Sequence, residues 1–144
     1  MADCTFSIPS EEEYNHLREL VGWEKMSHAQ FENSMANSVN VTARDGETCV
    51  GFARMITDHG LLSLIVDVMV DPAFQRQGIG AQMVRMLMLE HKSWLAPGEI
   101  AYIHILATTG NEPFYKKLGF TLRPNLLLGA GMTAKVRADR KKSL

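Results

Sequence analysis

The chain has 144 residues, of which 46% are apolar and 22% are charged, and its formal net charge is −1. This length suits one domain with its own core, so we expect a single domain over residues 1–144. The composition excludes a disordered chain, and 15 Lys and Arg residues balanced by 16 Asp and Glu argue against electrostatic binding of nucleic acid.

The N-terminal segment predicts one strand and two helices. A short strand is expected at Thr5–Ile8. A helix follows, because Ser10 suits the N-cap position and Glu13, three residues later, completes a capping box. That helix is expected to stop at Gly22, and a second one to cover Ser27–Met35.

A hairpin and a strong strand come next. Asp45–Gly46 joins the strand-like segments Asn40–Arg44 and Thr48–Ile56, which is typical of a β-hairpin. In Leu61–Val70 the even-numbered positions are all apolar, whereas the odd-numbered positions include Asp67. We therefore expect the even side chains to form pure core, with Asp67 on the opposite face of a central strand covered on both sides.

The remaining elements indicate a parallel crossover. A long helix is expected over Gly78–Trp94 and a strand over Ile100–Leu106, and a strand–helix–strand unit of this length favours a parallel pair. Three further elements are expected: a helix at Glu112–Leu118 and closing strands at Phe120–Leu122 and Met132–Val136. The result is an α/β fold with a mixed sheet.

Signals for a disulfide framework, a metal site or a membrane span are missing from the sequence. Cys4 and Cys49 lack the spacing of zinc ligands, and the five histidines show no metal-ligand spacing. The N-terminus has no apolar run of a signal peptide, and Leu61–Val70 is too short and polar to span a bilayer. We expect a cytoplasmic protein without a metal or a membrane partner.

Two glycines, Gly78 and Gly80, open the long helix directly after a strand and a turn. Glycine lets a ligand approach the backbone, and the free N–H groups of a first helical turn favour a phosphate. The alternative is a tight strand-to-helix turn with no ligand. A Rossmann fingerprint is excluded because Met83 occupies the position of its third small residue, and the Gly-Lys-Ser/Thr of a P-loop does not occur.

With its flanks, this segment resembles the acetyl-CoA site of the GNAT superfamily of N-acetyltransferases. Gln75–Gly80 fits the family pattern Gln/Arg-x-x-Gly-x-Gly/Ala, Val70–Pro72 is like its usual strand exit, and Asn111–Phe120 looks like its N…FYxKLGF signature. The resemblance implies a GNAT-like mixed, mostly antiparallel sheet, with a central splayed pair of parallel strands and helices on both faces.

The resemblance also implies a position for acetyl-CoA. Its pantetheine arm would pair with backbone groups of Val68 and Val70, and a backbone N–H near Val70 would polarise the thioester carbonyl. Asn111 and Phe114 would contact the arm. The pyrophosphate would lie on the amides of Arg76, Gln77, Gly78, Ile79, Gly80 and Ala81.

Two residues are the candidate catalytic groups. The resemblance makes Tyr115 the general acid toward the leaving thiolate, or a donor that orients the sulfur; the alternative is a tyrosine that merely packs. Asp67 is the first candidate for the base; it is equally interpreted as a carboxylate satisfied by Arg54, or as a ligand of a cationic substrate. Arg54 could itself hold a substrate carboxylate or form an ordinary ion pair.

The sequence thus predicts an N-acetyltransferase that moves the acetyl group of acetyl-CoA to a primary amine of a small molecule, of amine or amino acid type. The near-neutral charge favours a small acceptor. The alternatives are an acetyltransferase for protein lysines or N-termini and a non-catalytic acyl-CoA sensor. Because members of the superfamily are often dimers, the resemblance is also compatible with a homodimer.

Overall fold

The computed structural model describes residues 2–139 of the chain. By their internal contacts these residues divide into two compact units, Met1–Ala107 and Thr108–Leu144. The expectation of a single domain over the whole chain stays a prediction, and each unit is described by itself.

The first unit contains a five-stranded mixed sheet whose strands lie in chain order. The strands are β1 (Asp3–Phe6), β2 (Val39–Asp45), β3 (Thr48–Thr57), β4 (Leu62–Val70) and β5 (Tyr102–Ile105). β1 to β4 pair antiparallel, whereas β4 and β5 are parallel, as the crossover predicted. The expected fold class is thereby confirmed.

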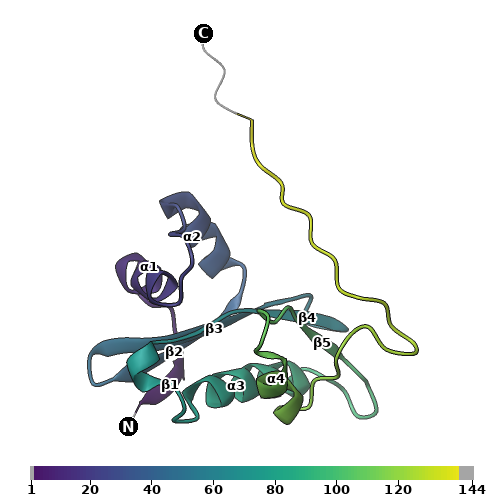
Figure 1. Cartoon of the computed structure of the whole chain (residues 1–144). Coiled ribbons are helices and arrows are strands. Elements are labelled where there is room, and N and C mark those ends of the chain that lie inside the picture. Colours follow the sequence, from purple (N-terminus) through teal and green to yellow (C-terminus); the bar gives the residue numbers. More distant parts are fainter. Residues whose placement is uncertain (1, 140–144) are drawn as a thin grey trace. The chain divides into compact units, whose positions relative to one another are not determined.

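Helices cover both faces of this sheet. They are α1 (Glu11–Leu20), α2 (His28–Ala36) and α3 (Ile79–Ser93), with a short 3-10 turn, η1 (Pro72–Phe74), before α3. Figure 1 shows α1 and α2 on one face of the sheet and α3 on the other. Within residues 2–139, no helix is long and apolar enough to cross a membrane.

The capping box predicted for α1 is present. The Ser10 hydroxyl accepts from the Glu13 N–H at 3.1 Å, and the Glu13 carboxylate accepts from the Ser10 N–H at 2.9 Å. Ser27 caps α2 in a similar way, accepting from the Gln30 N–H. Local side-chain hydrogen bonds therefore begin both helices where the sequence predicted them.

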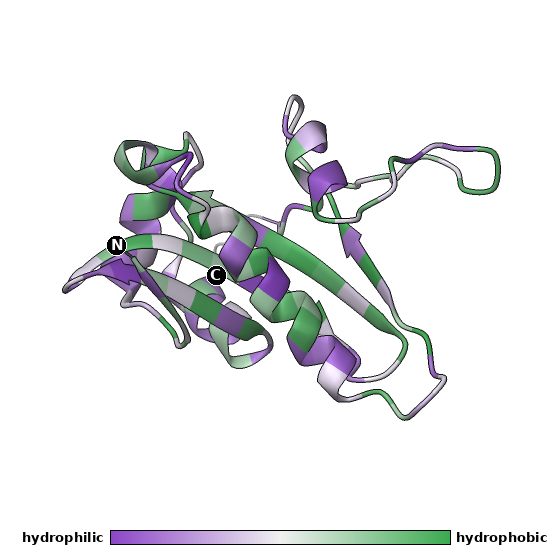
Figure 2. Cartoon of the chain, turned by 90° about the horizontal axis from the view of Figure 1, so that it is seen from below, coloured by the Kyte–Doolittle hydropathy of each residue, from purple (hydrophilic) through white to green (hydrophobic). Residues whose placement is uncertain are grey.

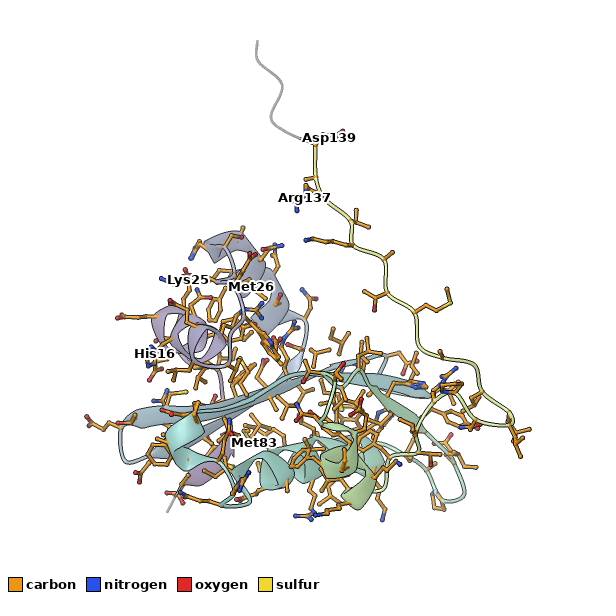
Figure 3. The ribbon with its side chains drawn as sticks, viewed as in Figure 1. His16, Lys25, Met26, Met83, Arg137 and Asp139 are labelled. Atoms are coloured by element: carbon orange, nitrogen blue, oxygen red, sulfur yellow. The ribbon has the colours of Figure 1, made fainter. Side chains whose placement is uncertain are left out.

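Each face of the sheet has its own core. The core under α1 and α2 consists of Tyr14, Leu17, Phe31, Met35, Cys49, Phe52 and Met69. On the other face, α3 crosses the sheet (Figure 2) and packs on β2, β3 and β4 with its buried residues, of which Met83 points toward the sheet in Figure 3. Gly51 of β3 makes room there, because a Cβ atom at this position would lie 3.2 Å from the terminal methyl of Met83.

The prediction that the even positions of β4 form pure core is wrong. Leu62 is 46% exposed, and the buried residues of this strand are the odd positions Ser63, Ile65 and Met69. A bulge is the reason: β3 advances two residues from Phe52 to Arg54 while β4 spans three, from Met69 to Val66. One extra residue exchanges the two faces of a strand. Ser63, before the bulge, contacts His91 of α3, whereas Met69, after it, belongs to the core under α1 and α2, so the odd positions do not share one face.

The second unit contains the predicted short helix, α4 (Glu112–Lys117), which ends before Gly119. The two closing strands predicted at Phe120–Leu122 and Met132–Val136 are absent; these residues form no ladder. A strand needs a neighbour for its backbone groups, and apolar side chains here, such as Met132 at 93% exposure, face solvent instead. Apolar composition alone was not enough to form these strands.

Candidate functional site

The turn before α3 presents a run of unpaired backbone amides. Gly78 occupies the N-cap position with φ of 83°, and Arg76 has φ of 65°, both in the left-handed region. After the Gln75 N–H, the next amide that donates to a described residue is that of Gln82, which reaches the Gly78 carbonyl at 3.0 Å. The intervening amides belong to Arg76, Gln77, Gly78, Ile79, Gly80 and Ala81.

These amides are suited to an anion. A residue with positive φ next to ordinary helical residues turns successive N–H groups toward one side and forms a concave anion site. The dipole of the 15-residue helix α3 adds positive potential at the same end, and no side chain caps it. The local geometry therefore fits the diphosphate that the sequence motif predicts.

β4 leaves part of one edge unpaired. The parallel ladder with β5 covers only the segment from Leu62 to Ile65. Further along, the Asp71 N–H donates to the Val50 carbonyl of β3 at 2.8 Å, and Val70 is registered opposite Gly51. In such a pair the N–H and C=O of Val70 point away from β3. Val68 lies two residues earlier, within the bulge between Val66 and Met69.

One side chain already uses this edge. The Gln75 amide nitrogen donates to the Val70 carbonyl at 3.0 Å. Its position confirms that the Val70 carbonyl points away from β3. The Val70 N–H faces an edge that no described strand covers, as an extended ligand requires.

Asp67 lies at the bulge of β4 and gathers three donors. Its carboxylate accepts from the Tyr14 hydroxyl at 2.6 Å, from Arg54 Nε at 2.7 Å and from an Arg18 nitrogen at 3.4 Å. Its side chain is only 11% exposed, and its φ of 55° is one that aspartate tolerates better than most residues. The predicted contact with Arg54 is present.

Tyr14 and Arg18 belong to this group but were not predicted as part of a site. Burial, followed by the hydrogen bond to Asp67, raises the pKa of Tyr14 to about 12, so it stays a neutral donor. Arg18 lies over the rings of Tyr14 and Trp23. The four-residue spacing of Tyr14 and Arg18 places them on one helix face, but nothing in the sequence links that face to Asp67.

The other predicted site residues lie in the second unit. Tyr115 is 9% exposed and makes edge contacts with Phe114 and Phe120, and burial raises its pKa to about 12. The Asn111 amide donates to the Thr108 hydroxyl at 2.6 Å. Phe114 is 37% exposed. The structure thus brings these three residues together on and beside α4.

The structure also contains a cluster of residues of types that can bind metal ions, which their spacing in the sequence did not indicate. Glu11, His28 and Glu32 each place one ligand atom within 4.8 Å of the others, because α1 and α2 are neighbours. An exposed ion pair between His28 and Glu11 accounts for the contact and raises the pKa of His28. Exposed groups of this kind are common without a metal, so the cluster adds no function.

Comparisons with known proteins agree with this geometry. The family described as "Acetyltransferase (GNAT) domain" matches residues 36–122. "Uncharacterized N-acetyltransferase ycf52" of Pyropia yezoensis is 32% identical over 81% of this chain and 68% of its own length. "Histone acetyltransferase TAP1" of Glycine max is 27% identical over 78% of this chain and 52% of its own length.

A solved structure extends the agreement to three dimensions. The GNAT family acetyltransferase SP0256 of Streptococcus pneumoniae TIGR4 superposes with a TM-score of 0.78 and 27% identity. The superposition covers 96% of this chain and 100% of that one. Sequence and fold therefore match the same group of proteins.

Proposed function

Because the chain belongs to the GNAT family of N-acetyltransferases, we propose that it transfers the acetyl group of acetyl-CoA to a primary amine of a small molecule by direct attack. The observation that supports the donor best is the run of six unpaired amides at the start of α3, which lies next to the open edge of β4 in the sequence. A diphosphate and an extended amide-bearing arm are the two parts of acetyl-CoA that such features bind.

The proposed donor site uses mostly backbone. The amides of residues 76–81 hold the diphosphate, while the backbone groups of Val68 and Val70 pair with the pantetheine arm. Asn111 and Phe114 contact the same arm, one by hydrogen bonding and the other by packing. Because the ligand binds backbone, the side chains of Val68 and Val70 remain available for the core.

The proposed reaction has a simple balance of bonds. The neutral amine attacks the thioester carbonyl, a C–N bond forms, and the C–S bond breaks to release the CoA thiolate. The amine nitrogen loses one proton, and the thiolate gains one. A backbone N–H near Val70 stabilises the negative charge that develops on the carbonyl oxygen.

Two side chains are proposed to handle these protons. A carboxylate offers about four acceptor positions, and three donors already bind Asp67, so one position remains for the amine or a water. Asp67 is therefore the proposed proton acceptor. Tyr115 is proposed to donate its hydroxyl hydrogen to the sulfur, either as a hydrogen bond that orients it or as the proton that the thiolate gains. Its raised pKa keeps the hydroxyl protonated at neutral pH.

A protein acceptor is the second candidate. It is favoured by the name of one relative, the histone acetyltransferase of Glycine max, which this chain matches over about half of that protein's length. The near-neutral formal charge of −1 favours a small acceptor instead, because it provides no strong field for a basic or acidic polymer. A non-catalytic acyl-CoA sensor is the third alternative.

An assay of free CoA thiol tests the proposal. The protein is incubated with acetyl-CoA and, in separate panels, with amines, amino acids or lysine-containing peptides, and the thiol released is measured. We expect turnover with at least one small amine, and mass spectrometry should show one added acetyl group on it. Turnover with peptides alone would contradict the small-molecule assignment. CoA binding without turnover on any acceptor would support the sensor instead.

A further inference from the structure

Arg54 uses only the Nε of its guanidinium in a hydrogen bond, and its two terminal nitrogens have no partner among the described residues. Nε donates to Asp67 at 2.7 Å, and this is the bond that fixes the side chain. Neither of the two terminal nitrogens donates to any described residue. The side chain is only 12% exposed, yet no buried side-chain nitrogen lacks a partner among residues 2–139, so these nitrogens reach solvent.

The charges around Arg54 do not cancel. Arg18 and Arg54 both contact Asp67, so two guanidinium groups share one carboxylate. Arg18 is otherwise engaged, because its Nε donates to the Glu24 carbonyl and its guanidinium lies over two aromatic rings. The group therefore keeps one net positive charge. One terminal nitrogen of Arg18 and both terminal nitrogens of Arg54 donate to no described residue, so Arg54 is the one of the two that offers a pair of free donors.

The position of Arg54 suits an acceptor substrate. Arg54 is registered opposite Val66, immediately before the bulge of β4. Val68, to which the thioester arm is assigned, lies two residues further along the strand, a distance of roughly 7 Å. Arg54 is therefore paired with the strand segment next to the backbone to which the thioester arm is assigned.

We infer that the amine acetylated by this protein also carries a carboxylate, and that the terminal nitrogens of Arg54 bind it. The inference rests on the proposed acetyltransferase function and narrows its acceptor to the amino acid class. Two parallel N–H donors match the two oxygens of a carboxylate. One net positive charge also matches a monoanion better than a phosphate, which carries nearly two negative charges at neutral pH.

The experiment compares matched pairs of acceptors, each an amino acid and its carboxamide, with an aminoalkyl phosphate of similar length as a third arm. For the wild-type protein we expect kcat/KM for the acid to exceed that for the amide by about 100-fold, because charged hydrogen bonds are lost with the amide. In Arg54→Gln this ratio should fall to about one, since the neutral side chain no longer distinguishes the acceptors.

Two further variants separate recognition from folding. Arg44→Gln is the matched control, because Arg44 of β2 also pairs with a carboxylate, that of Glu13 in α1, and this variant should keep the preference for the acid. Arg54→Lys retains the charge without the fork, so its acid-to-amide ratio should fall by about tenfold. It replaces Arg54→Gln as the decisive variant if melting curves show that the glutamine variant does not fold.

The outcomes distinguish this inference from the proposed function. Equal wild-type turnover of acids and amides, or an unchanged ratio in both Arg54 variants, overturns the carboxylate inference alone. A wild-type preference for the phosphate overturns it in favour of a phosphorylated amine. If the protein releases no CoA with any amine, the proposed acetyltransferase function is contradicted, and the carboxylate inference that rests on it is contradicted as well.

Discussion

Asp67 connects α1, β3 and β4 through a single carboxylate. It accepts hydrogen bonds from Tyr14 and Arg54 on one oxygen and from Arg18 on the other. Its positive φ carries a local cost that these bonds offset. The residue thus has an observed structural role and a proposed catalytic role, and the two can be separated by experiment.

Asp67→Asn should affect both roles. Removing the charge leaves two poorly exposed guanidinium groups without their anion, so we expect the free energy of unfolding to fall by about 3 kcal/mol in urea titrations. If Asp67 accepts the amine's proton, kcat per folded molecule should also fall by about 100-fold. Tyr14→Phe is the control: it removes one donor and about 1 kcal/mol but keeps the carboxylate. Unchanged kcat in Asp67→Asn would leave Asp67 a structural role only.

Tyr115 presents a different question, because its pKa of about 12 makes it a weak acid. Donating a proton to a thiolate whose thiol has a pKa of about 8.5 is uphill by about 5 kcal/mol. A hydrogen bond that orients the sulfur requires no such transfer. The high pKa therefore favours the orienting role.

Tyr115→Phe should lower kcat by about 100-fold, since either role needs the hydroxyl. The dissociation constant of acetyl-CoA, measured by calorimetry, should change less than about threefold because the ring is retained. In the wild type, no alkaline loss of kcat should come from Tyr115 below about pH 11, since the phenol stays protonated below its pKa of about 12. A kcat equal to that of the wild type would exclude both roles.

At the scale of elements, Glu13 joins the start of α1 to β2. It closes the capping box with Ser10 and accepts two hydrogen bonds from Arg44, at 2.7 and 2.9 Å. The Arg44 contact is the largest cause that lowers the pKa of Glu13 from 4.5 to about 2. One side chain therefore sets both where α1 begins and how it docks on the sheet.

This pKa shift predicts a pH dependence of stability. A carboxylate with a lowered pKa stabilises the folded state above its unfolded pKa of 4.5, and the contribution is lost as the pH falls toward about 2. Urea titrations at pH 7, 4.5 and 2.5 should therefore show a steeper loss for the wild type than for Glu13→Gln. Glu12→Gln, which removes an exposed neighbouring carboxylate, should follow the wild type. Parallel curves for wild type and Glu13→Gln would refute the assignment.

The elements also show where sequence patterns succeed and fail. Hairpin, caps and crossover each depend on a few neighbouring residues, and all three are present. The faces of β4 and the two closing strands depend on distant partners, and both predictions failed. Alternation in a sequence cannot show a bulge, and a run of apolar residues cannot show whether another strand lies beside it.

At the scale of the whole molecule, the proposed site residues come from two compact units. The diphosphate and pantetheine contacts are assigned to the first unit, Met1–Ala107, and Asn111, Phe114 and Tyr115 to the second, Thr108–Leu144. Any ligand that binds only the folded protein raises its stability by mass action. Measuring the stability of the protein in the presence of different fragments of acetyl-CoA can therefore show which part of the proposed site contributes to binding.

CoA at 100 times its dissociation constant should add about 2.7 kcal/mol to the free energy of unfolding. For a chain of this size the melting temperature should rise by roughly 5–10 °C. Pantetheine at the same concentration should give little shift, because it lacks the diphosphate that the six amides are proposed to hold. Equal shifts with both compounds in thermal melts would place the main binding energy outside the start of α3.

The sequence by itself determined the helix starts, the hairpin, the parallel crossover and the glycine-bearing turn before α3, because each is encoded by residues close together in the chain. The tertiary structure decided the contacts between residues that lie far apart in the sequence. It placed Tyr14 and Arg18 against Asp67, 53 and 49 residues away. It also left one edge of β4, beyond Ile65, without a partner strand among residues 2–139. Contacts of this kind depend on how whole elements pack, so no local pattern specifies them.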